Sequence, residues 1–264
     1  MSIEINRLFV TPEMASEWLK LNLRNRPLKD RKIAEYARDM AAGRFVFNGE
    51  AIKIADNGLV LDGQNRLHAC IRAGIGFETL VITGLAEYTQ ATMDSGARRS
   101  AGDQLAIDGV AYSRNLAAIA RRVWQWEQKN YRFTNTVSPS NSEILEVVDA
   151  HPSLARSVEI GHRCATQFKV SNCTANGLAH HLFLAIEPNQ TALFFARLET
   201  GADMEEGDPV LALRNRLIND QTMQRRAPFH QGVNYLLRTW NAIREGKEIS
   251  KLQCPPEASM VMPK

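Results

Sequence analysis

The pattern of apolar and polar positions changes once along the chain, near Gly109. Before that point, short apolar runs typical of strands alternate with stretches in which apolar residues recur every three or four positions, as they do in helices. Beyond that point the helical spacing prevails, and it predicts helices over 112–130, 142–150, 153–167, 174–185, 190–198, 209–219 and 229–245. We therefore predict an α+β fold, in which a domain containing strands is followed by an all-α helical domain.

The part before Gly109 contains four predicted strands, which cover 3–10, 51–54, 59–61 and 77–83. Thr11 and Pro12 have the residue types that begin a helix, and Asp30 is placed to cap a second one. Asn57-Gly58 between two apolar runs is a strong signal for a hairpin. That hairpin ends at Asp62-Gly63, after which apolar residues return with helical spacing. The sequence therefore predicts a strand, a tight turn and a helix at this point.

The turn carries the residues most suggestive of chemistry. A turn glycine such as Gly63 lets the backbone approach a ligand closely, and the free amides that begin a helix favour an anion. Arg66 would lie in the first helical turn, where a guanidinium takes a phosphate in a bidentate way. Asp62, Gln64 and Asn65 offer oxygens and amides to a metal ion, a base or a ribose. We predict a nucleotide or phosphate site; the alternative is an ordinary turn with a solvated Arg66.

At 62–66 the sequence resembles the ParB and sulfiredoxin superfamily, whose members carry a strand, a short Gly-x-x-Arg turn and a helix that binds a nucleotide. The nearest variant is the Asp-Gly-Gln-His-Arg form of DndB-like and phage proteins, and the looser resemblance spans Ile5 to Gly109. Asn65 stands where a histidine is usual, which removes a proton-transfer group. Gln64 stands where sulfiredoxins have their cysteine, so repair of cysteine sulfinic acid is not expected.

The resemblance implies a small mixed-sheet domain that binds a nucleoside triphosphate with Mg²⁺. Under this reading Arg66 and the amides after Gly63 hold phosphate, while Asp62 and Glu50 help to place the ion and are the candidate catalytic residues. Glu50 is alternatively an exposed glutamate at a strand edge. Replacement of Arg66 by alanine is expected to abolish nucleotide binding and to leave the melting temperature nearly unchanged.

A second group of residues predicts contacts to phosphate, either of a nucleotide or of DNA. Arg26 lies in a basic loop between the first two helices, and the others precede a helix that Ser100 and Asp103 are placed to cap. The alternative for both segments is a solvated basic loop. The candidate contacts are Arg26, Asp94, Gly96, Arg98 and Arg99.

Two function classes remain open from these residues. The first is a ParB-like protein of phage or mobile-element type that binds a nucleoside triphosphate and acts on or near DNA, as a possible NTPase and homodimer. The second is a small-molecule phosphotransferase, for which Glu50 is the candidate base. A metal-dependent nuclease of the same superfamily is a further alternative, although the sequence lacks an acidic cluster for it.

Composition limits the remaining possibilities. The chain has 264 residues, of which 44% are hydrophobic and 23% charged, so a folded globular protein is expected and disorder is not. The net charge of +3 is too small to argue for nucleic acid by itself. The four cysteines form no Cys-x-x-Cys pair and no apolar run approaches the roughly 20 residues of a membrane span, so we expect a cytoplasmic protein.

The domain limits follow from these patterns. We expect a nucleotide-binding domain over 1–110, a helical domain over 111–250 and a loosely ordered, proline-containing tail over 251–264. A zinc site is not expected, because the ligand types that fall close together do not form the paired spacing of structural zinc sites. These residues are His162, Cys164, Cys173 and His180.

Overall fold

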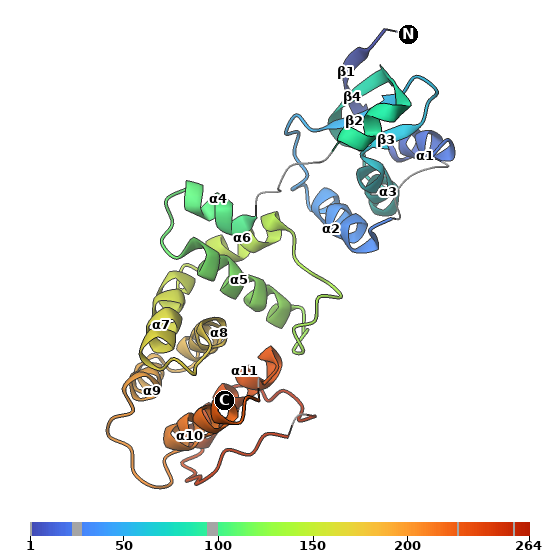
Figure 1. Cartoon of the computed structure of the whole chain (residues 1–264). Coiled ribbons are helices and arrows are strands. Elements are labelled where there is room, and N and C mark those ends of the chain that lie inside the picture. The colour runs from blue at the N-terminus through green and yellow to red at the C-terminus, as the bar shows by residue number, and fades with distance from the viewer. Residues whose placement is uncertain (1, 23–27, 94–99, 226, 256) are drawn as a thin grey trace. The chain divides into compact units, whose positions relative to one another are not determined.

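The structure is a computed structural model that describes residues 2–22, 28–93, 100–225, 227–255 and 257–264. These residues form two compact units (Figure 1). Unit 1 comprises Met1–Arg98 and Thr136–Ser142, and unit 2 comprises Arg99–Asn135 and Glu143–Lys264. The chain is thus mixed α/β, with strands in unit 1 and helices throughout the described part of unit 2. The predicted order of a strand-containing part and a helical part is confirmed.

Unit 1 is built on a four-stranded mixed sheet in the order β1-β4-β2-β3. The edge strand β1 pairs antiparallel with β4, β4 pairs parallel with β2, and the β2–β3 hairpin is antiparallel. The hairpin confirms the prediction from Asn57-Gly58. The strands are β1 (Glu4–Val10), β2 (Ala51–Ala55), β3 (Val60–Asp62) and β4 (Phe77–Leu85).

Three helices lie on the same side of this sheet (Figure 1). They are α1 (Pro12–Lys20), α2 (Asp30–Ala41) and α3 (Gln64–Ala73). Helix α1 begins as predicted, with the Thr11 hydroxyl accepting a hydrogen bond from the Met14 amide. Ile33, Ile52 and Leu67 are buried between helices and sheet. The short 3₁₀ helix η1 (Glu87–Thr92) follows β4, and the Gln90 side chain donates to the Leu61 carbonyl at 3.0 Å.

A segment distant in sequence also belongs to unit 1. Residues 136–142 pack on α2, where Arg38 donates to the Ser138 carbonyl at 2.8 Å. The Ser140 hydroxyl donates to Asp39 at 2.9 Å, and Arg44 donates to the same carboxylate at 3.0 Å. Asp39 is buried, and these two donors satisfy it. Local sequence patterns do not reveal these contacts, because the partners are about 100 residues apart.

Unit 2 has one hydrophobic core, to which the aromatic side chains of Phe183, Phe194 and Trp240 contribute. Asp208 caps helix α10 (Pro209–Thr222) by accepting a hydrogen bond from the Val210 amide. The helices are α4 (Ala101–Ile107), α5 (Ser113–Glu127), α6 (Asn141–Ala150), α7 (Leu154–Gln167), α8 (Cys173–Leu184), α9 (Pro188–Thr200), α10 (Pro209–Thr222) and α11 (Phe229–Arg244).

Two details of the predicted domain limits differ from the structure. The compact units divide at Arg98–Arg99 and not near residue 110, because Ala101 and Leu105 of α4 are buried in the core of unit 2. The tail 251–264, predicted to be loosely ordered, lies along α11. Leu252 and Cys254 are buried there, and the Trp240 indole donates to the Lys264 carbonyl at 2.9 Å.

Replacement of Gly63 by alanine tests the turn that joins the sheet to α3. Its φ of 96° lies in the left-handed region, and an added Cβ would lie 2.3 Å from Ile52 Cδ1. We expect Gly63→Ala to lower the free energy of unfolding of unit 1 by about 2–4 kcal/mol, because backbone strain and a clash add together. Hydrogen exchange of α3 amides at increasing urea concentration measures this loss.

Gly74, at the other end of α3, provides the matched control. Its φ is 65°, and an added Cβ would meet nothing within 4 Å. Gly74→Ala therefore carries the backbone strain alone, and we expect it to cost about 1–2 kcal/mol. Equal losses in the two variants would contradict the packing constraint at Ile52.

Candidate functional site

The site predicted from the sequence begins where β3 ends. The Asp62 carboxylate accepts a hydrogen bond from the Gly63 amide at 2.7 Å, and Gly63 is the residue before α3. The Gly63 carbonyl then accepts from the amides of Arg66 and Leu67, which closes the first helical turn. The chain therefore changes from strand to helix over a single residue. The first amides of α3 are brought beside the end of the sheet.

Two cations converge on Asp62. Lys53 Nζ lies 3.8 Å and Arg66 Nη2 lies 3.7 Å from Asp62 Oδ2. The side chains of Arg66 and Asp62 are 11% and 12% exposed, and that of Lys53 is 31% exposed. These three groups carry two positive charges and one negative charge. The start of α3 thus has an excess positive charge in a half-buried setting, where charges are poorly screened.

Arg66 also ties the helix to the sheet. Its Nη2 donates to the Ala51 carbonyl at the beginning of β2, at 2.7 Å. Among the described residues this is the one hydrogen-bond acceptor of the guanidinium, so Nε and Nη1 keep their donors. The solvated Arg66 considered as an alternative is not what the structure has. Arg66 instead has a structural contact and donors left for an anion.

Gln64 and Asn65 face a neighbouring segment of the protein. The Asn22 amide donates to Gln64 Oε1 at 3.2 Å, and Gln64 is buried. The Lys29 amide donates to Asn65 Oδ1 at 3.5 Å. Both side chains thereby connect the start of α3 to Asn22 and Lys29. Their contacts are structural, while the Asn65 backbone amide has no acceptor among the described residues.

Glu50 is exposed and precedes β2 directly. Because β2 and β3 pair antiparallel with Lys53 opposite Asp62, Glu50 lies at the same end of the sheet as the Asp62-Gly63 turn. Its carbonyl accepts from the Thr79 hydroxyl at 2.7 Å, which fixes its backbone. Glu50 is therefore an exposed residue at this end of the sheet, with its backbone held in place.

The described residues do not form a metal centre by themselves. No group of three or more histidine, cysteine, aspartate or glutamate side chains gathers in this part of the chain. The positive charges of the two cations beside Asp62 would repel a divalent metal ion bound there. A protein-held Mg²⁺ at Asp62 therefore does not fit these residues, whereas an anion does.

The second predicted group cannot be placed. Its members, whether expected to contact phosphate of a nucleotide or of DNA, all lie outside the described residues. They are Arg26, Asp94, Gly96, Arg98 and Arg99.

Lys53 was missed by the sequence analysis. It alternates with Ile52 and Ile54, which are buried, so its side chain belongs to the opposite face of the sheet. The hairpin turn at Asn57-Gly58 would have suggested a cross-strand partner near Asp62. The strand register could not be predicted from the turn, because a bulge between Lys53 and Ile54 shifts the pairing by one residue.

In the described part of unit 2, histidine and cysteine side chains form no group of three or more metal-ligand types, either among themselves or with aspartate or glutamate. The His162 ring contacts the Tyr112 ring in a tilted arrangement, with ring centroids 4.9 Å apart, whereas His180 Nδ1 lies 2.9 Å from the Ser157 hydroxyl. Burial raises the pKa of Cys164 to about 12, so it is a protonated thiol at neutral pH. These contacts show what His162 and His180 touch in the folded chain.

The fold and site define a mixed α/β protein with an excess of positive charge at a strand-to-helix turn. No family model, curated protein or solved structure matches the chain. The resemblance to the ParB and sulfiredoxin superfamily therefore rests on the turn sequence and stays a prediction. In the part of the chain that the structure describes, no helix is long and apolar enough to cross a membrane.

The contact of Arg66 with Ala51 changes the expected result of replacing it. Arg66→Ala removes a charged hydrogen bond at a nearly buried site and leaves Asp62 with one cation. We expect the free energy of unfolding of unit 1 to fall by about 1.5–3 kcal/mol. Urea unfolding followed by exchange of α3 amides measures this loss. A stability equal to that of the unchanged protein would contradict the structural contact.

The burial of the His180 ring leads us to expect that the stability of unit 2 depends on pH. Burial, and then the charges of Arg156, His181 and Arg163, lower the pKa of His180 from 6.5 to about 4. The unfolded chain therefore binds more protons between these values, and stability is lost as the pH falls below about 6.5. We expect His180 to contribute a loss of about 1–2 kcal/mol on going from about pH 7 to pH 5.

Urea unfolding followed by circular dichroism measures this dependence, because unit 2 holds most of the helix. His180→Asn keeps a polar group near Ser157 and should reduce the pH dependence by about half, because burial also lowers the pKa of His181 to about 4 and that residue keeps its contribution. His162→Asn changes an exposed histidine of the neighbouring helix and should leave the profile as it is. A profile unaffected by His180→Asn would show that burial of this ring is not its cause.

Proposed function

We propose that unit 1 binds a nucleoside triphosphate at the start of α3 and that the protein acts on or near DNA. The observation that carries the proposal is the arrangement of Lys53 and Arg66 around Asp62, directly beside the first amides of α3. A helix N-terminus and an excess cation attract the same ligand charge. The resemblance of 62–66 to nucleotide-binding turns supports a nucleotide as the anion.

Each residue has a distinct part in this proposal. Lys53 offers an ammonium group that is one-third exposed, and Arg66 offers the donors of Nε and Nη1. The Asn65 amide is available to the same phosphate. Asp62 orients the Gly63 amide and keeps both cations in place. Gly63 permits the close approach, because a side chain there would meet Ile52 and Arg66.

In this proposal, Mg²⁺ binds together with the nucleotide, whose phosphates hold it. Magnesium is commonly held by phosphate oxygens and water with one or two carboxylates, so it does not need a protein cage. Glu50 is an exposed carboxylate at this end of the sheet. It would hold or deprotonate a water at the metal-bound phosphate, and slow hydrolysis would then change the state of the bound nucleotide.

The proposed action on DNA has a weaker basis. It rests on the phage-type resemblance and on the basic residues Arg26, Arg98 and Arg99, which lie outside the described residues. Contacts of this kind bind phosphate without reading sequence and weaken with salt.

Lys53→Gln tests the site without the structural cost of altering Arg66. Calorimetric titration with ATP, CTP, GTP and UTP in Mg²⁺ should show that one of them binds, and Lys53→Gln should weaken it by about tenfold to a hundredfold. Lys53 makes one ion pair at 3.8 Å, so the variant should keep its unfolding midpoint. Lys20→Gln, which alters an exposed pair with Glu17 on α1, is the matched control and should bind normally.

A random DNA duplex added to each titration tests coupling. Tighter nucleotide binding with DNA supports action on DNA, whereas turnover without DNA favours the phosphotransferase alternative. If no nucleotide binds, or if Lys53→Gln binds as well as Lys20→Gln, the proposed site is wrong.

A further inference from the structure

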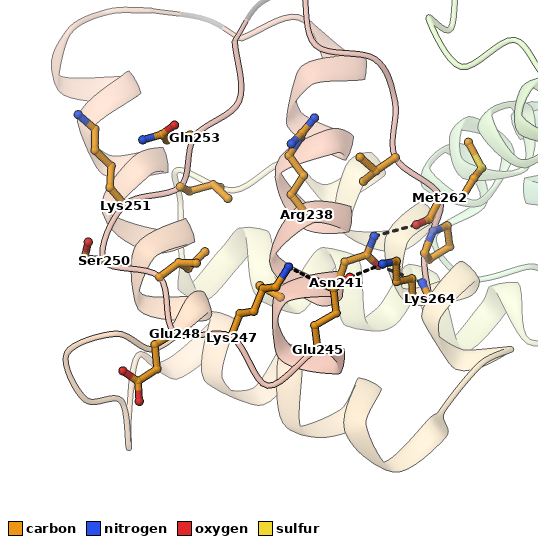
Figure 2. Close-up of a pocket in the computed structure, with 15 residues that line it drawn as sticks. Arg238, Asn241, Glu245, Lys247, Glu248, Ser250, Lys251, Gln253, Met262 and Lys264 are labelled. Carbon is orange, nitrogen blue, oxygen red and sulfur yellow. Dashed lines mark hydrogen bonds and ion pairs between the residues drawn. The ribbon is translucent and has the colours of Figure 1, made fainter.

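A pocket in unit 2 shares no residue with the proposed nucleotide site. It has a volume of about 810 Å³ and lies between the second half of α11, the chain that follows this helix, and residues 261–264 (Figure 2). Its size is that of sites for small organic molecules. Part of its lining is apolar, from Ala242, Ile249, Leu252 and Val261. The charged part of the lining has four cationic side chains and two carboxylates.

Hydrogen bonds to α11 hold both walls of this pocket. On one side, the Gln231 side chain donates to the Cys254 carbonyl at 3.2 Å. On the other side, Asn241 donates to the Met262 carbonyl at 2.8 Å and accepts from the Lys264 amide at 3.0 Å. Two segments without helical structure are thereby fixed to one helix. The pocket is preformed, which reduces the entropy lost on binding.

Arg238 of α11 lines the pocket, and its side chain also lies within hydrogen-bond reach of the Cys254 thiol. Its Nε atom is buried and has no hydrogen-bond acceptor in the part of the chain that the structure describes. A buried donor without an acceptor costs about 1–3 kcal/mol in general, and such groups are rare unless a ligand or water serves them.

The charges around Arg238 favour an anion. Glu245 is paired with both Lys247, at 2.6 Å, and Lys264. Hydrogen bonds from these two lysines lower the pKa of Glu245 to about 2, so this carboxylate is ionised and fully engaged. Figure 2 shows the polar ends of Lys251 and Gln253 on the same side of the pocket as the Arg238 guanidinium, away from Glu245.

We propose that this pocket binds a small organic anion, whose phosphate or carboxylate group accepts hydrogen bonds from Arg238 and whose apolar part lies on Ile249, Leu252 and Val261. Lys251 adds charge at the same end, and Gln253 adds an amide donor. The remaining carboxylate of the lining, Glu248, lies apart from them in Figure 2. The site therefore has a cationic end and an apolar floor, which together select a molecule with both features.

Four probes test this on the full-length protein by calorimetry: phenyl phosphate, benzoate, phenol and inorganic phosphate. Phenyl phosphate or benzoate should bind, and the stronger of the two identifies the anionic group. Phenol and inorganic phosphate should each bind at least about tenfold more weakly, because each lacks one of the two features. Equal binding of phenol, or no binding of either aromatic anion at about 10 mM, overturns the proposal.

Variants separate a ligand role of Arg238 from a structural one. Arg238→Met keeps the volume and removes the orphan donor, so it should abolish anion binding while leaving the unfolding midpoint unchanged or raised. Lys251→Gln alters an exposed residue and should weaken binding several-fold without affecting folding. Arg156→Met, at an exposed pair with Glu159 on α7, is the control and should bind as the unchanged protein does. Unchanged binding in both pocket variants overturns the proposal.

Discussion

The joint between β3 and α3 is the constraint on which unit 1 depends. One residue with a positive φ, Gly63, turns the chain from the sheet into a helix that must then pack back onto the sheet. The Asp62 carboxylate holds the Gly63 amide, and the guanidinium of Arg66 one turn later reaches the Ala51 carbonyl. One hydrogen bond therefore connects the end of β3 to the turn, and another connects the first turn of α3 to β2. A shift of this turn would move every apolar residue of α3 relative to the sheet.

The same contacts explain why the turn suits an anion. A nearly buried carboxylate needs positive partners, and two of them are present at Asp62. Once Asp62 is compensated, one positive charge remains beside the amides that begin α3. The guanidinium has more donors than its structural contact uses. Stability and ligand binding thus draw on the same side chains, so a loss of binding on replacing Arg66 cannot by itself distinguish the two roles.

Features encoded over a few residues were predictable from the sequence. Thr11 and Asp208 cap helices, Asn57-Gly58 forms a hairpin, and Ser100 pairs with Asp103 in a capping box. Each depends on local backbone chemistry and needs no distant partner. The turn at Gly63 was found for the same reason. Of the candidate site, the sequence identified Asp62, Gly63 and Arg66 as neighbours, and the structure places them in contact.

Features that depend on distant residues were not predictable. The parallel pairing of β2 with β4, the return of 136–142 to α2 and the packing of 251–264 along α11 all join segments far apart in sequence. The capping box at Ser100 located the start of α4 but not the unit to which this helix belongs. That is decided by the burial of Ala101 and Leu105 in the core of unit 2. Lys53 was missed because a bulge alters the strand register.

The two proposed anion sites differ in how the protein supplies positive charge, and the difference follows from local structure. In unit 1 the charge comes with a helix N-terminus, whose amides add to Lys53 and Arg66, and a compact phosphate suits such a site. The pocket of unit 2 lies beside the second half of α11, where the helix dipole opposes an anion. A side-chain cation must provide the attraction there, and the guanidinium of Arg238, which lines the pocket, meets that need. The apolar floor then has to contribute part of the binding free energy, which selects a ligand with a hydrophobic part over a simple phosphate.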